Sequence, residues 1–87
     1  MSEPDYEKLA EQIAQLRVDD VLTGAASTLA SVAYAKLAAK DLEQAKHAID
    51  VLGTIVPLLQ DEGLKRDLGS ALANLQVAYA DARAEPS

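Results

Sequence analysis

The chain has 87 residues, a net charge of −6 and no cysteine, which predicts one domain without disulfides or thiolate metal ligands. Duplex nucleic acid and anionic membranes attract basic surfaces, so we expect neither as a direct partner of this acidic chain. Seventeen alanines, three tyrosines and no phenylalanine or tryptophan leave small side chains for the core. Because small side chains bury little area, we expect association with another chain to reinforce the fold.

The first predicted helix covers residues 3–17, with Ser2 as its cap and Pro4 in its first turn. One partner face is expected for this helix, because its apolar side chains form a single stripe. The stripe consists of Tyr6, Leu9, Ala10, Ile13 and Leu16. We therefore expect a loosely packed helix, and the pattern leaves open whether it packs on its own chain or on a neighbouring copy.

The second predicted helix covers residues 21–39, and either Asp19 or Asp20 is expected to cap it. Its apolar residues lie on two stripes, which implies neighbours on two sides. The longest uncharged run, residues 21–35, is shorter than the roughly 20 apolar residues of a membrane span. The acidic N-terminus also lacks the apolar run of a signal peptide. We therefore expect no membrane contact and a cytoplasmic location, which the lack of cysteine also suits.

The central predicted helix covers residues 41–61 and has the clearest pattern in the chain. Its apolar residues fall on two adjacent stripes that together cover roughly half of the helix circumference. Asp41 is the expected N-cap. Pro57 removes a hydrogen bond and crowds the carbonyl of Gly53, so we expect a kink near Gly53 within one continuous helix. Gly63 is expected to end this helix in the left-handed conformation.

The last predicted helix covers residues 64–83, and residues 84–87 are expected to fray. Nothing in the chain suggests a second domain, so residues 1–87 are expected to form one. The predicted fold is all-α, a small antiparallel bundle of about four helices.

Three of the four predicted helices carry more apolar surface than an antiparallel bundle of this size can hide. The surplus is mostly alanine with scattered valine, which suits close helix packing between chains. We therefore expect a homodimer or a higher homo-oligomer, most simply a two-fold one, and no cofactor. The candidate interface residues are Val21, Ala25, Val32, Ala35, Ala48, Val51, Ile55, Leu58, Ala73, Val77 and Ala80.

Glu43, His47 and Asp50 are the one set of side chains that could carry chemistry. Steps of four and three place them on one face of the central helix, where they could bind a divalent metal or run acid–base chemistry. With a single histidine in the chain, a solvated cluster on the helix face is the simpler interpretation. The chain has no glycine-rich phosphate loop and no serine–histidine pattern, so we expect it not to be an enzyme.

Two motifs resemble a known family. The first consists of residues 42–52, LEQAKHAIDVL, and the second of residues 75–79, LQVAY. They resemble the signature and the C-terminal motif of the bacterial domain-of-unknown-function family 1844, most closely its actinobacterial branch with alanine-rich helices. Similarity spans roughly residues 18–83, although the family usually has a glycine in place of Ala38 and a longer connection before the central motif. The resemblance implies a small, soluble, helical bacterial protein of undetermined activity, and it carries over no catalytic residue.

The leading hypothesis is a non-enzymatic helical protein that self-associates and docks another protein through its alanine-lined helices. The alternative is a small-ligand or divalent-metal-binding protein that uses Glu43, His47 and Asp50 or a pocket near Pro57. A third hypothesis is an accessory factor of RNA or ribosome metabolism that acts through protein contacts, since the chain is acidic.

Overall fold

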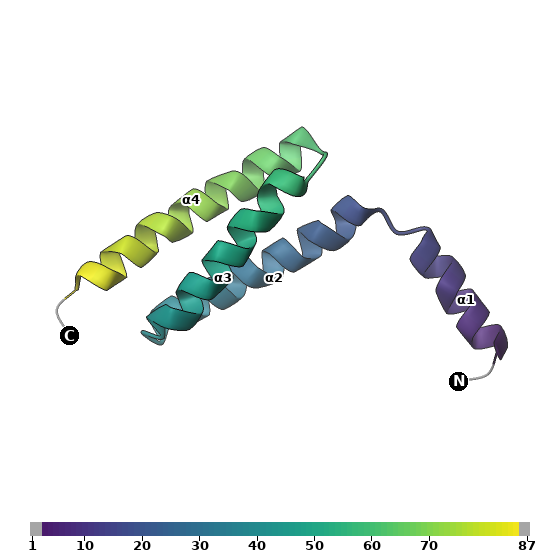
Figure 1. The fold of residues 1–87 in the computed structure, drawn as a ribbon, viewed down its shortest axis with the longest axis horizontal. Helices are drawn as coiled ribbons and strands as arrows, with labels where there is room; N and C mark the ends of the chain where they lie inside the picture. The colour runs from purple at the N-terminus through teal and green to yellow at the C-terminus, as the bar shows by residue number, and fades with distance from the viewer. Residues whose placement is uncertain (1–2, 86–87) are drawn as a thin grey trace.

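The computed structural model describes residues 3–85, which form four α-helices and a short 3-10 turn, with no strand among them. The elements are α1 (Glu3–Ala14), α2 (Val18–Ala38), α3 (Leu42–Ile55), η1 (Val56–Leu58) and α4 (Glu62–Ala84). The chain reverses between α2 and α3 and again between α3 and α4, so α3 runs antiparallel to both neighbours (Figure 1). This arrangement confirms the predicted all-α class and the small helical bundle. The predicted Ser2 cap and residues 86–87 of the predicted tail lie outside the described residues.

The core of the bundle lies where α2, α3 and α4 meet, and small side chains fill most of it. Leu52 of α3 and Leu75 of α4 are the largest side chains that are fully buried. The other buried apolar residues are Ala26, Ala33, Ala45, Ala48, Ile49, Val56 and Leu59. Because the alanine side chain is a single methyl group, the helix backbones can approach closely, but each contact buries little apolar area.

The turn between α2 and α3 is made by Lys40, whose φ of 61° places it in the left-handed region. The Lys40 N–H bonds to the carbonyl of Leu37 at 3.0 Å. The Asp41 N–H bonds to the carbonyl of Lys36 at 2.9 Å, which completes a Schellman motif. Asp41 then begins α3 as its N-cap, as predicted, because its side chain accepts a hydrogen bond from the backbone N–H of Gln44 at 3.3 Å.

The central segment is not one kinked helix, because α3 ends at Ile55 and Pro57 lies in the 3-10 turn that follows. Proline has no N–H with which to continue the α-helical ladder, so the chain tightens into η1. It then becomes extended at Leu59, with φ −67° and ψ 139°. The prediction of one helix over residues 41–61 is therefore wrong in its last two turns.

The start of α4 also differs from the prediction. Asp61 is its N-cap, because its side chain accepts a hydrogen bond from the backbone N–H of Leu64 at 3.0 Å. Gly63 lies in the first turn of α4 and does not take the predicted left-handed conformation. The same helix extends to Ala84, one residue into the predicted tail.

At its start, α2 makes a long-range polar contact that the sequence pattern did not predict. The helix begins at Val18, and Arg17 occupies its N-cap position without a side-chain cap bond. Asp19, one of the two predicted caps, lies inside the first turn and is 9% exposed. Its carboxylate accepts hydrogen bonds from the backbone N–H groups of Gln60, at 3.0 Å, and Asp61, at 2.9 Å. The cap prediction is therefore wrong, and Asp19 instead ties the turn before α4 to the start of α2.

The first helix projects away from the other three, so the described chain is 58 Å long and only 14 Å thick (Figure 1). It ends at Ala14, earlier than the predicted residue 17. Its apolar stripe faces solvent, with Tyr6 66% and Ile13 57% exposed. Isolated helices shorter than about 12–15 residues are marginal in water, so α1, with 12 residues, has little stability of its own.

Replacing Asp19 by alanine should lower the free energy of unfolding by about 2–3 kcal/mol, because two backbone N–H groups lose a charged acceptor. Asp20→Ala is the matched control, since Asp20 is exposed, and it should change stability by no more than about 0.5 kcal/mol. Urea unfolding followed by circular dichroism measures both variants. Equal losses in the two variants would contradict the role assigned to Asp19.

Amide hydrogen exchange should separate α1 from the rest of the chain. We expect α1 amides to exchange fast, because the helix has no packed face, and the amides around Leu52 and Leu75 to be the most protected. Exchange followed by mass spectrometry at low micromolar concentration measures this. Protection of α1 equal to that of α3 would show that α1 is docked and not projecting.

Candidate interaction surface

The outward face of α2 carries a largely apolar stripe whose residues are exposed in the described chain. Its residues follow alternating steps of three and four, the spacing typical of a seam between two helices. All of them are exposed, with Val18 at 71%, Val21 at 54% and Val32 at 39%. We call this set the outer stripe of α2: Val18, Val21, Ala25, Thr28, Val32 and Ala35.

The side chains in the middle of the outer stripe are small, and the one hydroxyl among them is hydrogen-bonded. The hydroxyl of Thr28 donates a hydrogen bond to the carbonyl of Gly24 at 3.0 Å, so it is satisfied within its own helix. Gly24 lies beside the stripe, and a Cβ added there would meet no atom within 4 Å. A glycine inside a helix costs about 1 kcal/mol relative to alanine. Nothing in the described chain approaches Gly24 closely enough to offset that cost.

The outer stripe is the second apolar face of α2. On the inner face, Ala26 and Ala33 are fully buried against the other helices. By length and composition alone, Val18–Ala38 could cross a membrane, a possibility that the count of uncharged residues did not reveal. Only 11% of that apolar stretch is buried within the chain.

The other predicted interface residues lie on α3, η1 and α4, and of these Ala48 and Val51 share a groove with Val32 of the outer stripe. Ala48 is 6% exposed and belongs to the chain's own core, so it is not available to a partner. Val51 and Ile55 are half-buried, and Ile55 packs against that core. Leu58 and Val77 are each 61% exposed, on η1 and α4 respectively. The two remaining predicted residues, Ala73 and Ala80, are exposed on α4.

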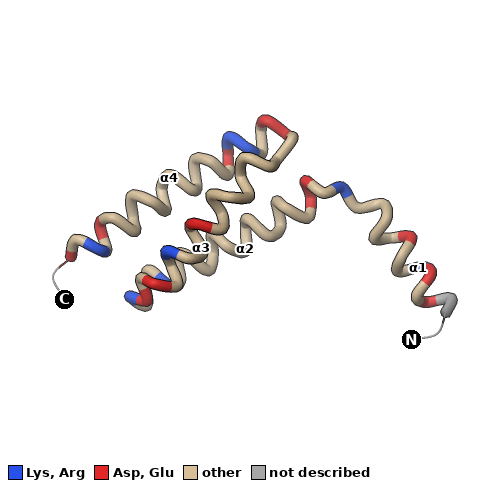
Figure 2. Tube along the Cα trace, in the orientation of Figure 1, with Lys and Arg blue, Asp and Glu red and all other residues tan. Residues whose placement is uncertain are grey.

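Charge on α2 is confined to its two ends (Figure 2). The first turn holds Asp19 and Asp20, and the last turn holds Lys36, with Lys40 in the turn that follows. Asp61, at the turn that Asp19 holds, adds to the acidic end. The outer stripe itself carries no charged residue, and at its far end Lys36 forms an ion pair with Asp41 at 3.9 Å.

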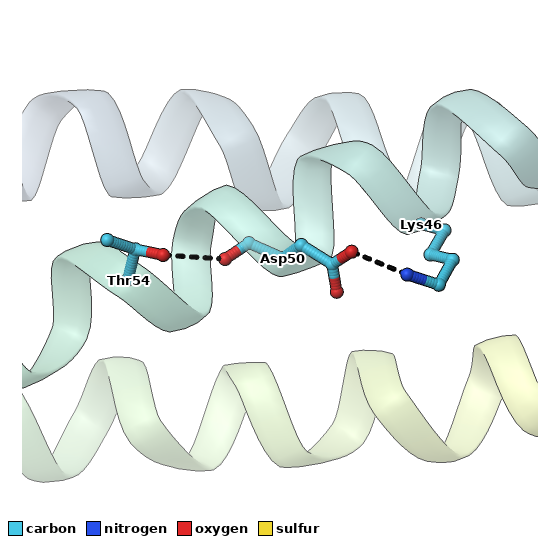
Figure 3. A network of polar contacts seen from close by, with 3 residues as sticks. All are labelled: Lys46, Asp50 and Thr54. Atoms are coloured by element: carbon cyan, nitrogen blue, oxygen red, sulfur yellow. Dashed lines mark hydrogen bonds and ion pairs between the residues drawn. The ribbon is translucent and has the colours of Figure 1, made fainter.

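Glu43, His47 and Asp50, the predicted cluster, do not form a group placed to hold a metal ion. Asp50 already has a partner, because its carboxylate oxygen lies 2.7 Å from Nζ of Lys46, one turn earlier on α3 (Figure 3). Asp50 raises the pKa of Lys46 above its ordinary value, through this hydrogen bond first and its negative charge second. The Asp50 carbonyl accepts a hydrogen bond from the Thr54 hydroxyl at 3.1 Å. Across the part of the chain that the structure describes, no group of three acidic, histidine or cysteine side chains is placed to hold a metal ion.

His47 instead faces an open groove between α2 and α3. The groove has a volume of about 150 Å³ and is mostly apolar. Its lining consists of Leu29, Val32, Gln44, His47, Ala48 and Val51. Neither Glu43 nor Asp50 lines this groove. Sequence reasoning missed this groove because the lining comes from two helices whose relative rotation the spacing does not specify.

The predicted pocket near Pro57 corresponds to an open hollow of about 300 Å³ beside the Asp19 contact. Arg17, Val18, Asp19, Leu58 and Gln60 line it. The carboxylate of Asp19 already accepts hydrogen bonds from the backbone N–H groups of Gln60 and Asp61. Within the described residues, no buried side-chain nitrogen or oxygen lacks a partner. The Asp19 carboxylate therefore serves the fold of the chain at this hollow.

No protein-family model, curated protein or solved structure matches this chain. The resemblance of residues 42–52 to family 1844 therefore stays a prediction from the motif.

Divalent metals should leave the melting temperature unchanged, because Lys46 neutralises Asp50 and His47 faces the groove. Thermal unfolding with and without Zn²⁺, Mg²⁺ or Mn²⁺ measures this, and His47→Ala and Glu43→Gln are the variants to compare. A Zn²⁺-dependent rise in the wild type that disappears in both variants would restore the metal-site hypothesis.

Proposed function

We propose that this chain is a non-enzymatic helical module that self-associates, with the outer stripe of α2 as its contact surface. The observation that carries the proposal is that one helix is apolar on two sides while its own chain covers only one. Val21, Ala25, Val32 and Ala35 were predicted as interface residues from spacing, and all four are exposed along this stripe.

Association would bury further apolar area, of which the core of the single chain has little. Burying a valine or leucine side chain stabilises by about 1.5–3 kcal/mol, and among the described residues Leu52 and Leu75 are the largest side chains that are fully buried. Covering Val18, Val21 and Val32 would add contributions of the same kind. A dimer is therefore expected to be more stable than the isolated chain.

The projecting α1 supports a second role, docking of another protein. Its stripe is exposed and belongs to a helix too short to be stable by itself, and the helix carries a net negative charge. A partner with an apolar groove and a basic rim would match it. The absence of a metal cluster and of unpartnered buried polar groups among the described residues leaves the ligand-binding alternative with less support. We also propose a cytoplasmic location for the module.

Val21→Glu should convert the oligomer to a monomer, because a carboxylate in the seam would lose its water on association. The fold of the single chain should be kept, since Val21 is 54% exposed. Gln76→Glu is the control, because Gln76 is exposed on α4 and the substitution changes the charge by the same amount.

Sedimentation equilibrium gives the mass of each variant, and circular dichroism gives its helical content. We expect a dimer or larger species for the wild type and for Gln76→Glu, and a helical monomer for Val21→Glu. A wild-type chain that is monomeric throughout the micromolar range would contradict the proposed self-association.

A further inference from the structure

We propose that α1 is a strap that folds back onto the outer stripe of α2 in its own chain, about a hinge at residues 15–17. The structure shows the open form, in which α1 projects away from the other helices (Figure 1). In the closed form, α1 covers the surface through which the module self-associates. The fold-back itself is argued from the two helices alone, and its regulatory consequence rests on the proposed self-association.

The hinge is a short connection without helical structure. Helix α1 ends at Ala14 and α2 begins at Val18. Arg17 between them is extended, with φ −84° and ψ 139°, and all three connecting residues are exposed. Loops of about two to five residues join antiparallel helix pairs. A change in the backbone angles of residues 15–17 is therefore enough to lay α1 antiparallel along α2, and it disturbs no buried contact of the core.

The apolar residues on the two sides of the hinge mirror each other. From Leu16 back to Tyr6, the stripe of α1 runs in steps of three, four and three residues. The outer stripe of α2 runs in the same steps from Val18 forward to Thr28. Positions at equal distance from Arg17 therefore face each other when the chain reverses there. The facing pairs include Ile13 with Val21, Leu9 with Ala25, and Tyr6 with Thr28.

The facing side chains also fit each other in size. The bulky Leu9 lies opposite the small Ala25, and Ala10 lies opposite Gly24. A Cβ added at Gly24 would meet no atom within 4 Å in the open form, so this side of α2 has room for a neighbouring helix. Close approach of Ala10 would use that room and would offset the cost of a glycine inside a helix.

Closing leaves the charges of α1 in water. Glu7, Lys8 and Glu11 lie off its apolar stripe, and the outer stripe of α2 carries no charged residue. The fold-back therefore buries no charge, which would be costly without a partner. The antiparallel direction also brings the opposite ends of the two helix dipoles together.

The hinge makes α1 a competitor of a second copy for the same surface. A short linker holds its two ends at an effective concentration on the order of millimolar, whereas a second copy is present at micromolar concentration. A closed chain covers the outer stripe from Val18 to Thr28, so it does not self-associate. A partner that captures α1 would release the stripe and promote self-association. Because α1 is held by one face only, it opens readily, and its amides still exchange faster than those of the core.

A pair of engineered cysteines tests the fold-back directly, because the chain has no cysteine of its own. Leu9→Cys combined with Ala25→Cys should form a disulfide within one chain under mild oxidation, seen as a monomer by non-reducing electrophoresis and mass spectrometry. Leu9→Cys combined with Ser27→Cys is the matched control. Ser27 is also exposed on α2 but lies off the outer stripe, so this pair should stay reduced.

Two results of this experiment would overturn the fold-back. Equal oxidation of the two cysteine pairs would show that α1 has no preferred register on α2. A disulfide that forms only between separate chains, when the two single variants Leu9→Cys and Ala25→Cys are mixed, would place α1 on a second copy.

The regulatory consequence is tested by opening the strap without changing the outer stripe. Ile13→Glu should open it, because the new carboxylate would lose its water on closing. If two chains in three are closed, opening them lowers the apparent dissociation constant of self-association about threefold. Gln12→Glu makes the same charge change on the polar face of α1 and should leave the constant unchanged. Sedimentation equilibrium measures all three chains.

The direction of the change decides the outcome. Weaker self-association of Ile13→Glu would show that α1 adds to the contact between copies, and it would overturn the inference. Wild-type and Ile13→Glu chains that are both monomeric at every concentration would remove the proposed self-association and the regulatory consequence with it. The disulfide result would still decide whether α1 folds back.

Discussion

Small buried side chains constrain every other feature of this structure. Alanine occupies four of the buried positions on α2 and α3, and among the described residues Leu52 and Leu75 are the largest side chains that are fully buried. Close helix packing follows, because little stands between the backbones. Limited stability follows as well, since the free energy of apolar burial scales with area. A fold made in this way is expected to depend on contacts outside its own core.

One such contact lies within the chain. The carboxylate of Asp19 holds the backbone of the turn before α4, so a polar interaction fixes one end of the bundle where apolar packing is thin. It also orients α2, because the first turn of that helix must face the turn between η1 and α4. The remaining face of α2 is then directed outward, which is why the outer stripe is left uncovered by its own chain.

The sequence predicted the helices well because their apolar periodicity is strong, and it predicted the Asp41 cap because that bond spans only three residues. The prediction was wrong where two local sequence signals indicated different helix boundaries. Pro57 ended α3 although the apolar stripe continued in register, and Asp61 capped a new helix where Gly63 had suggested an end. The role of Asp19 depends on a turn about forty residues away, which no local pattern encodes. For the same reason, spacing alone did not reveal that His47 lines a groove between two helices.

The central claim is that the fold of one chain is coupled to the presence of another. The dependence of the thermal midpoint on protein concentration tests it most directly, because association raises the stability of the folded state by mass action. The account predicts that the midpoint rises steadily across the micromolar range in the wild type. A midpoint that is independent of concentration, in a chain that unfolds reversibly as a monomer, would contradict it.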